Sequence, residues 1–201
     1  MAKSKVRSGL LEPEDIPERM LPHSGYGCDV PWEDLDDWIR RQEKHGLDMN
    51  PDYQRGHVWT EDQQRAFVEY VLCGGETSRT LVFAQIGKGS AFATTKRTAD
   101  GGFVYPGFSI LDGKQRCEAI RRLVAGEFRV FSRPEKLEGY LWSELGNGFR
   151  SWVSTTIRVV IVTLPSRKAI LATYLKFNGG GTPHTAEELA RSRALYDAEP
   201  G

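Results

Sequence analysis

The sequence predicts an α+β fold, in which helices flank a small mixed sheet, and three observations lead to this expectation. Apolar runs rich in β-branched residues, typical of strands, stand at residues 80–86 and 157–164. Strands and helices do not alternate regularly, which argues against a doubly wound parallel sheet. A length of 201 residues fits one compact domain, which we place at residues 31–201, after an N-terminal arm.

The predicted arm comprises residues 1–30. This stretch is polar and is interrupted by turn-forming residues, namely Pro13, Pro17, Pro22, Gly25 and Gly27. Because its apolar density is low, we expect it to have no core of its own and to contribute little to the core of the domain.

The remaining elements follow from local patterns. Helices are predicted at residues 31–45, from the cap Thr60 to Gly74, from the turn at Gly113 to about Gly126, at residues 166–177, and after the cap Thr185. Strands are predicted at residues 80–86, 108–111 and 157–164, the last of them central, with a hairpin at residues 91–107. Residues 127–156 contain a helical segment that is interrupted near residues 146–148.

The composition narrows the function classes. Lysine and arginine number 27, as do aspartate and glutamate, so DNA contact would need a local patch rather than a global basic field. Three cysteines without paired spacing indicate a reducing compartment, not a disulfide framework or a zinc site. No apolar run approaches the ~20 residues of a transmembrane helix, and no signal core follows the N-terminus. We therefore expect a soluble, cytoplasmic protein that does not contact a membrane.

The chain is organised around residues 108–120, where a buried strand is predicted to pass through a tight turn into a helix. Asp112 is predicted to cap this helix, with Gln115 completing a capping box. Lys114 and Arg116 fall in the first helical turn, where the helix dipole is positive and disfavours cations. Two cations beside free backbone N–H groups predict a site for an anion, in particular phosphate.

A structural alternative stays open for this segment. In it, Asp112 and Gln115 only cap the helix, and Arg116 pairs with a buried carboxylate. This alternative accounts for the capping residues, but it does not explain why the cations stand at the end of the helix that disfavours them.

A second group of candidate residues lies in the loop before the helix at residue 60, namely Tyr53, Gln54, Arg55 and His57; Trp59 of the same loop is not assigned to the site. For each of them a plain structural role is also open. Tyr53 and Trp59 would be core aromatics, and His57 a surface histidine. Asn178, which precedes three glycines, would be a helix C-cap and turn rather than a ligand.

Three separated segments of the chain resemble the domain that carries the DGQQR motif in GmrSD-type modification-dependent restriction enzymes, part of the ParB/sulfiredoxin-like superfamily. They are residues 51–55 with 58–59, residues 110–116, and residues 177–183 followed by 187–189. The resemblance spans about residues 32–195. It implies a nucleotide-binding and hydrolysing pocket around residues 112–116, lined by the loop at residues 53–55, in a family that acts on DNA, often modified phage DNA.

The sequence also departs from the family pattern. Lys114 stands where the family usually has glutamine, and His184 stands where an apolar residue is usual. The restriction enzymes carry a second, His-Asn-His type nuclease domain, but the four histidines of this chain form no such constellation. We therefore expect a stand-alone domain to which DNA cleavage is not transferred.

The expected chemistry is phosphoryl transfer from, or hydrolysis of, a nucleoside triphosphate. Arg116 and Lys114 would neutralise phosphate oxygens, and backbone amides from Gly113 onward would cradle a phosphate. Asp112 would hold Mg²⁺ or orient the attacking water, and Gln115 would position that water. In the neighbouring loop, Gln54 would line the nucleotide site. Arg55 would act there as a second clamp, and Tyr53 would stack on a base.

Two other functions stay open. The first is a non-catalytic sensor or adaptor that binds a nucleotide or modified DNA for a partner nuclease or effector protein. The second is a stand-alone ParB-like nuclease or DNA phosphotransferase. Two basic pairs, Arg121–Arg122 and Lys96–Arg97, are either solvated faces or the local patch that would touch a DNA backbone.

Overall fold

The computed structural model describes residues 25–54, 59–87, 96–97, 103–132, 138–152, 155–178 and 186–200. The strands are β1 (Gly25–Pro31), β2 (Thr80–Ile86), β3 (Lys96–Arg97), β4 (Phe103–Val104), β5 (Ser109–Asp112) and β6 (Thr156–Leu164). The α-helices are α1 (Leu35–Glu43), α2 (Glu61–Leu72), α3 (Lys114–Val124), α4 (Asn147–Trp152), α5 (Arg167–Asn178) and α6 (Ala186–Ala198). Short 3-10 helices, η2 (Trp32–Asp34) and η4 (Trp142–Glu144), precede α1 and α4. The predicted α+β class is confirmed.

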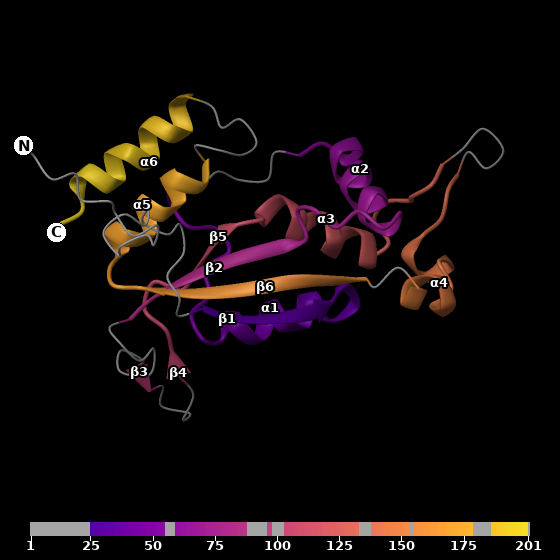
Figure 1. Ribbon diagram of the computed structural model, residues 1–201, viewed down its shortest axis with the longest axis horizontal. Helices are drawn as coiled ribbons and strands as arrows, with labels where there is room; N and C mark the ends of the chain where they lie inside the picture. Colours follow the sequence, from indigo (N-terminus) through magenta and orange to yellow (C-terminus); the bar gives the residue numbers. More distant parts are fainter. Residues whose placement is uncertain are drawn as a thin grey trace, which may run out of the picture.

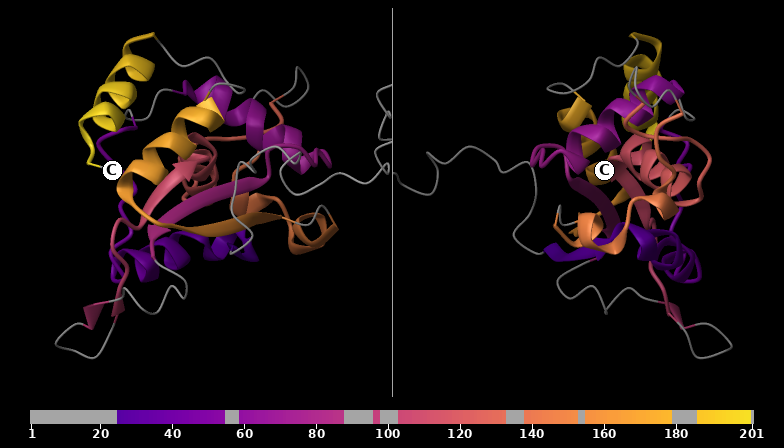
Figure 2. Two further views of the ribbon diagram at one scale, coloured as in Figure 1. Left: turned by 60° about the vertical axis from the view of Figure 1, so that its left-hand side comes forward. Right: turned by 90° about the vertical axis from the view of Figure 1, so that its right-hand side faces the viewer.

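A four-stranded mixed sheet in the order β1-β6-β2-β5 forms the centre of the fold (Figure 1). The strand β6 pairs in parallel with β2 and antiparallel with β1, while β2 and β5 are antiparallel. The long apolar strand β6 is therefore internal to the sheet, as its composition predicts. A separate two-stranded hairpin, β3–β4, projects away from this sheet (Figure 2).

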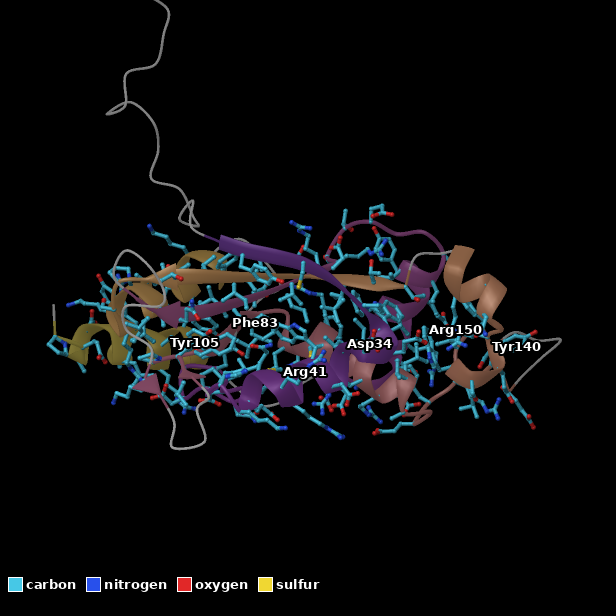
Figure 3. All side chains as sticks on the ribbon, turned by 90° about the horizontal axis from the view of Figure 1, so that it is seen from below. Asp34, Arg41, Phe83, Tyr105, Tyr140 and Arg150 are labelled. Carbon is cyan, nitrogen blue, oxygen red and sulfur yellow. The ribbon has the colours of Figure 1, made fainter. Side chains whose placement is uncertain are left out.

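The two faces of the sheet bury different helices, because successive strand residues point to opposite sides. Leu81 and Phe83 of β2 belong to the larger core cluster, together with buried residues of α1, α2 and α3. Val82 and Ala84, which alternate with them, belong to a second cluster with buried residues of α5. Figure 3 places Phe83 among the side chains between the strands and α1, where its ring lies 5.2 Å from that of Trp38.

The boundary of the predicted N-terminal arm differs from the structure. Residues 25–31, most of which the sequence assigns to the arm, form the edge strand β1 and pair antiparallel with β6. Val30 is only 5% exposed and belongs to the larger core cluster. Because glycine weakens the interior of a strand, Gly25 and Gly27 give this segment no local strand signal. Residues 1–24 lie outside the described part of the chain.

The predicted capping box at the start of α2 is confirmed. Thr60 accepts a hydrogen bond from the backbone of Gln63, and the Gln63 side chain accepts one from the backbone N–H of Thr60. The predicted cap of the last helix, Thr185, lies outside the described residues. None of the helices in the described ranges is long and apolar enough to cross a membrane.

Candidate functional site

The strand, turn and helix predicted around residue 112 are present. Strand β5 ends at Asp112, and α3 begins at Lys114. Gly113 between them has a φ of +94°, a left-handed conformation that residues with a Cβ rarely adopt. A Cβ at this position would lie 2.7 Å from Leu81 Cδ2 and 3.2 Å from the Thr80 carbonyl oxygen. The turn therefore needs glycine for two reasons: its backbone is left-handed, and β2 lies too close to leave room for a Cβ.

The predicted capping box of this helix is wrong. Gly113 is the N-cap residue, and no side chain caps the helix. Asp112 lies one residue too early, at the end of the strand, and its Oδ2 accepts a 2.6 Å hydrogen bond from Arg116 Nη2. The side chain of Gln115 reaches the preceding loop instead, where its Oε1 accepts from the backbone N–H of Trp59 at 3.1 Å.

Arg116 fastens the helix start to two strands. Besides Asp112, its Nη2 donates to the carbonyl oxygen of Thr80 in β2 at 3.0 Å. The Arg116 side chain is 18% exposed and that of Asp112 40%. The ion pair that the structural alternative requires for Arg116 is therefore present, but its carboxylate, that of Asp112, is half-exposed rather than buried. Within the described ranges, the buried Nε–H of Arg116 has no hydrogen-bond acceptor.

The first turn of α3 carries cations and no acidic residue. Lys114 Nζ donates to Asn50 Oδ1 at 2.9 Å, so the lysine lies over the loop that precedes the Tyr53–Gln54 pair. Burial lowers the pKa of Lys114, while Asp48 and Glu118 act in the opposite direction. Positive charge is therefore concentrated where the helix dipole is also positive.

The structure brings the Tyr53–Gln54 loop to the strand that precedes this turn. Gln54 Nε2 donates to the carbonyl oxygens of Ile110 at 3.0 Å and of Leu111 at 2.9 Å. The Tyr53 hydroxyl lies 2.9 Å from Ser109 Oγ and donates to the Ile110 carbonyl at 3.1 Å. Both side chains thus hold the backbone of β5 directly before Asp112.

Tyr53 is a core residue in this arrangement. It is 5% exposed, and its ring centroid lies 4.9 Å from that of Tyr174 in α5. Burial raises the pKa of the Tyr53 hydroxyl, which stays protonated and can donate its hydrogen bond. This placement favours a core aromatic over a platform on which a base stacks.

The other predicted site residues are only partly placed. Arg55 and His57 lie outside the described residues. Asn178 is the last residue of α5, so it lies at the end of a helix, where a C-cap role is expected. Phe177 beside it packs on the cluster that contains Tyr53 and Leu111. Tyr53, Gln54 and Phe177, which come from two of the segments of the resemblance, thus lie around β5, which begins the third.

Two further contributors, Asn50 and Thr80, were not predicted. Asn50 accepts from Lys114, and the Thr80 carbonyl accepts from Arg116. An asparagine before a proline is a common turn residue. The sequence also does not indicate which backbone carbonyl will accept a hydrogen bond from a distant side chain. Only the spatial neighbourhood identifies either of them.

The described residues contain no group of three or more His, Cys, Asp or Glu side chains that would form a metal centre by themselves. A family model described as the N-terminal domain of the GmrSD restriction endonuclease matches residues 35–195. In the same comparisons, no curated protein and no solved structure matches the chain.

Proposed function

Because the chain belongs to the family of GmrSD restriction endonuclease N-terminal domains, we propose that it binds a nucleoside triphosphate and hydrolyses it or transfers its phosphate during restriction of foreign DNA. The observation that carries this proposal is the first turn of α3. It holds Lys114 and Arg116, has no acidic residue, and follows a left-handed glycine. Backbone N–H groups at a helix start and two cations together favour a phosphate.

The contacts of each residue support a role in phosphate binding. Lys114 donates an exposed hydrogen bond to the neutral amide of Asn50, and a negatively charged phosphate oxygen is a stronger acceptor for the same ammonium group. The Arg116 guanidinium has a donor without an acceptor in the described part of the chain. This Nε–H is buried, so a phosphate would contact the exposed part of the Arg116 side chain, 18% of its surface.

Mg²⁺ is the metal that such a site would use. Mg²⁺ is commonly held by one or two carboxylates together with substrate phosphates and water, so Asp112 alone is enough protein ligand. The Asp112 side chain is 40% exposed and therefore accessible. When bound, Mg²⁺ would neutralise charge on the phosphates.

A second candidate function is a nucleotide-dependent or DNA-dependent adaptor for a partner nuclease. It is favoured by the internal hydrogen bonds of the predicted catalytic groups. Asp112 accepts from Arg116, Gln115 accepts from Trp59, and Gln54 donates to two backbone carbonyls. Side chains held in this way shape a binding site, whereas a general base needs a free lone pair directed at water.

DNA contact is proposed through the β3–β4 hairpin. Arg121 pairs with Asp36 at 2.5 Å, and Arg122 pairs with Glu127 at 2.6 Å, so much of the charge of this arginine pair is compensated. Lys96 is exposed on the hairpin that projects from the sheet (Figure 2). An exposed lysine on a projecting element suits contact with a phosphate backbone.

The proposal is tested by incubating the pure protein with ATP, GTP, CTP or UTP and Mg²⁺, with and without DNA, and measuring phosphate release. We expect release by the wild type and its loss in Lys114→Glu and Arg116→Ala. Arg129→Ala is the matched control, because Arg129 also pairs with a carboxylate, that of Glu144, and donates to a carbonyl, that of Gly139. Nucleotide binding without release would favour the adaptor, and release that persists in both site variants would contradict the assigned site.

A further inference from the structure

The two outer edges of the central sheet differ in whether another segment covers them. At the β5 edge, the backbone N–H of Asp48 donates to the Phe108 carbonyl at 2.9 Å, and the Asp48 carbonyl accepts from the N–H of Ile110 at 3.1 Å. At the β1 edge, no strand in the described part of the chain pairs with the side that faces away from β6. Figure 3 shows β1, the indigo strand, along one margin of the molecule. The open edge of the sheet is therefore that of β1.

The register between β1 and β6 shows which backbone groups of β1 point outward. The N–H of Trp32 donates to the Thr155 carbonyl at 2.9 Å, one position beyond the paired strands. In an antiparallel ladder such hydrogen-bonded pairs alternate with pairs that exchange no hydrogen bonds, so the even-numbered residues of β1 are bonded to β6. In agreement, the N–H of Arg158, which faces Asp29, donates on the other side of β6. The N–H and carbonyl groups of Gly27 and Asp29 are therefore directed to the open edge.

The side chains at this edge combine an exposed aromatic ring with an exposed ion pair. Tyr26 of β1 is 64% exposed. Arg158 Nη1 lies 3.4 Å from Asp29 Oδ1, and the two side chains are 54% and 57% exposed. The same guanidinium lies over Gly27, because a Cβ at this glycine would be only 3.0 Å from Arg158 Nη2. Arg158 of β6 thus extends across β1, where a strand added to the open edge can meet it.

We propose that the open edge of β1 binds β1 of a second copy of this chain, antiparallel and about a two-fold axis at Cys28. Cys28 is the midpoint of the seven-residue strand, so this register pairs the full length of both strands. It places Gly27 opposite Asp29 of the second copy, and both residues direct their backbone groups outward, as a hydrogen-bonded pair requires. Because each copy uses the same surface, the contact is self-complementary and closes at a dimer.

Charge complementarity favours a second copy over an unrelated strand. Side chains directly opposite each other in an antiparallel pair lie on the same face, so Asp29 of the second copy would lie beside Gly27, where Arg158 stands. Each Arg158 would then lie between two Asp29 carboxylates, its own and that of the second copy, and two arginines would balance two aspartates. On the other face, Tyr26 would lie opposite Val30 of the second copy, which removes part of its exposed ring from water.

The proposed dimer leaves the candidate site of each copy free. In the sheet order β1-β6-β2-β5, the strand β1 and the site strand β5 stand at opposite edges. Joining two copies through β1 would therefore form one continuous sheet with a β5 strand at each end. The dimer requires no nucleotide, so this inference does not depend on the proposed function.

The test measures the sedimentation of the full chain over a wide range of protein concentrations, without nucleotide. We expect the wild type to form a dimer as its concentration rises. Asp29→Lys should raise the dissociation constant of this dimer at least about tenfold, because it places a cation beside Arg158 of the second copy. Asp197→Lys is the matched control, since it makes the same change of charge at an exposed residue of α6 and should leave the dissociation constant unchanged.

Oxidative cross-linking tests the register of the two strands. The two Cys28 residues would face each other as a pair without hydrogen bonds, with Cα atoms about 4.5 Å apart, which is within the range of a disulfide. Copper–phenanthroline should therefore link two copies through Cys28 in a Cys73→Ser background, which removes the exposed thiol.

A charge swap keeps the test decisive if circular dichroism shows that Asp29→Lys alone is misfolded. Asp29→Arg combined with Arg158→Asp restores the complementary charges in both copies and should restore the wild-type dissociation constant. A monomer at every concentration would overturn the proposal. A dimer that forms no Cys28 disulfide, or that a folded Asp29→Lys variant leaves unchanged, would also overturn it, because the two copies would then meet through another surface.

Discussion

Arg116 donates a 2.6 Å hydrogen bond to the carboxylate of Asp112, four residues earlier in the chain, so the two ends of the Asp112–Arg116 segment are joined across the turn at Gly113. The pair compensates one of the two cations at the start of α3. With Asp112, Lys114 and Arg116 all ionised, two positive charges and one negative charge leave a single net positive charge on the segment. Lys114 is the residue that provides it to an incoming phosphate.

Arg116→Ala should destabilise the fold. The variant loses hydrogen bonds to Asp112 and to the Thr80 carbonyl, and hydrogen bonds of charged groups contribute about 1.5–3 kcal/mol. Removing a cation from a helix start returns only about 0.3–1 kcal/mol. Urea unfolding should therefore show a net decrease in the free energy of unfolding. Arg129→Ala should show a smaller decrease, because the Arg129 side chain is 35% exposed. A variant as stable as the wild type would show that the Asp112–Arg116 pair contributes nothing.

Gly113→Ala should be markedly more harmful than Gly126→Ala. Both glycines have positive φ, +94° and +76°, so both variants carry the left-handed penalty of about 1–2 kcal/mol. Only at Gly113 would the new Cβ meet Leu81 at 2.7 Å, whereas nothing lies within 4 Å at Gly126. Such crowding adds about 1–3 kcal/mol, which chemical denaturation resolves. Equal losses for the two variants would contradict the close approach of β2 to the turn.

The thiol of Cys117 should be unreactive in the folded protein. Burial raises the pKa of Cys117 from 9.0 to about 12, so almost no thiolate exists at pH 8. Iodoacetamide should label the exposed Cys73 and should reach Cys117 only in urea. Because the unfolded thiol loses its proton before the folded one, stability should fall as pH rises from about 9 towards 12. Cys117→Ala should remove that part of the slope, and rapid labelling of native Cys117 would refute its burial.

The pH dependence of nucleotide binding should follow the protonation of the Lys114 side chain. Burial lowers its pKa, and the phosphate needs the charged ammonium, so nucleotide affinity should decline with rising pH earlier than for a solvent-exposed lysine. Lys114→Arg keeps its charge throughout this range and should flatten the profile. Calorimetric titrations at a series of pH values measure both curves. A wild-type profile that does not change on the alkaline side would remove Lys114 from the site.

The parts of the fold that the sequence predicts correctly are those set by local patterns. The internal position of β6, the capping box at Thr60 and the strand-to-helix turn at Gly113 all follow from neighbouring residues. The misassigned parts depend on distant ones. Gly25–Pro31 becomes a strand only because β6 offers it an edge. The Asp112 carboxylate is engaged by Arg116, and a glycine in the left-handed region takes the cap position instead.

In the candidate site, too, some features were predictable from the sequence and others depend on distant residues. The convergence of Tyr53, Gln54 and the Asp112–Arg116 segment was predicted, because the family resemblance already linked these segments. The burial of Tyr53 was open, since it depends on Tyr174 of α5, which covers that face of the sheet. The ion pair of Asp52 with Arg167 joins residues 115 positions apart and has no local signal at all.

The central claim, that the start of α3 binds the phosphates of a nucleotide, is tested most directly by calorimetric titration of ATP and GTP with Mg²⁺ into three proteins. These are the wild type, Arg116→Ala and Arg129→Ala, each verified as folded by circular dichroism at the titration temperature. The account predicts binding to the wild type and to Arg129→Ala, and an affinity reduced at least about tenfold in Arg116→Ala, since charge-assisted contacts of about 1.5–3 kcal/mol are lost. Equal affinities in all three proteins, or no binding by the wild type, would contradict it.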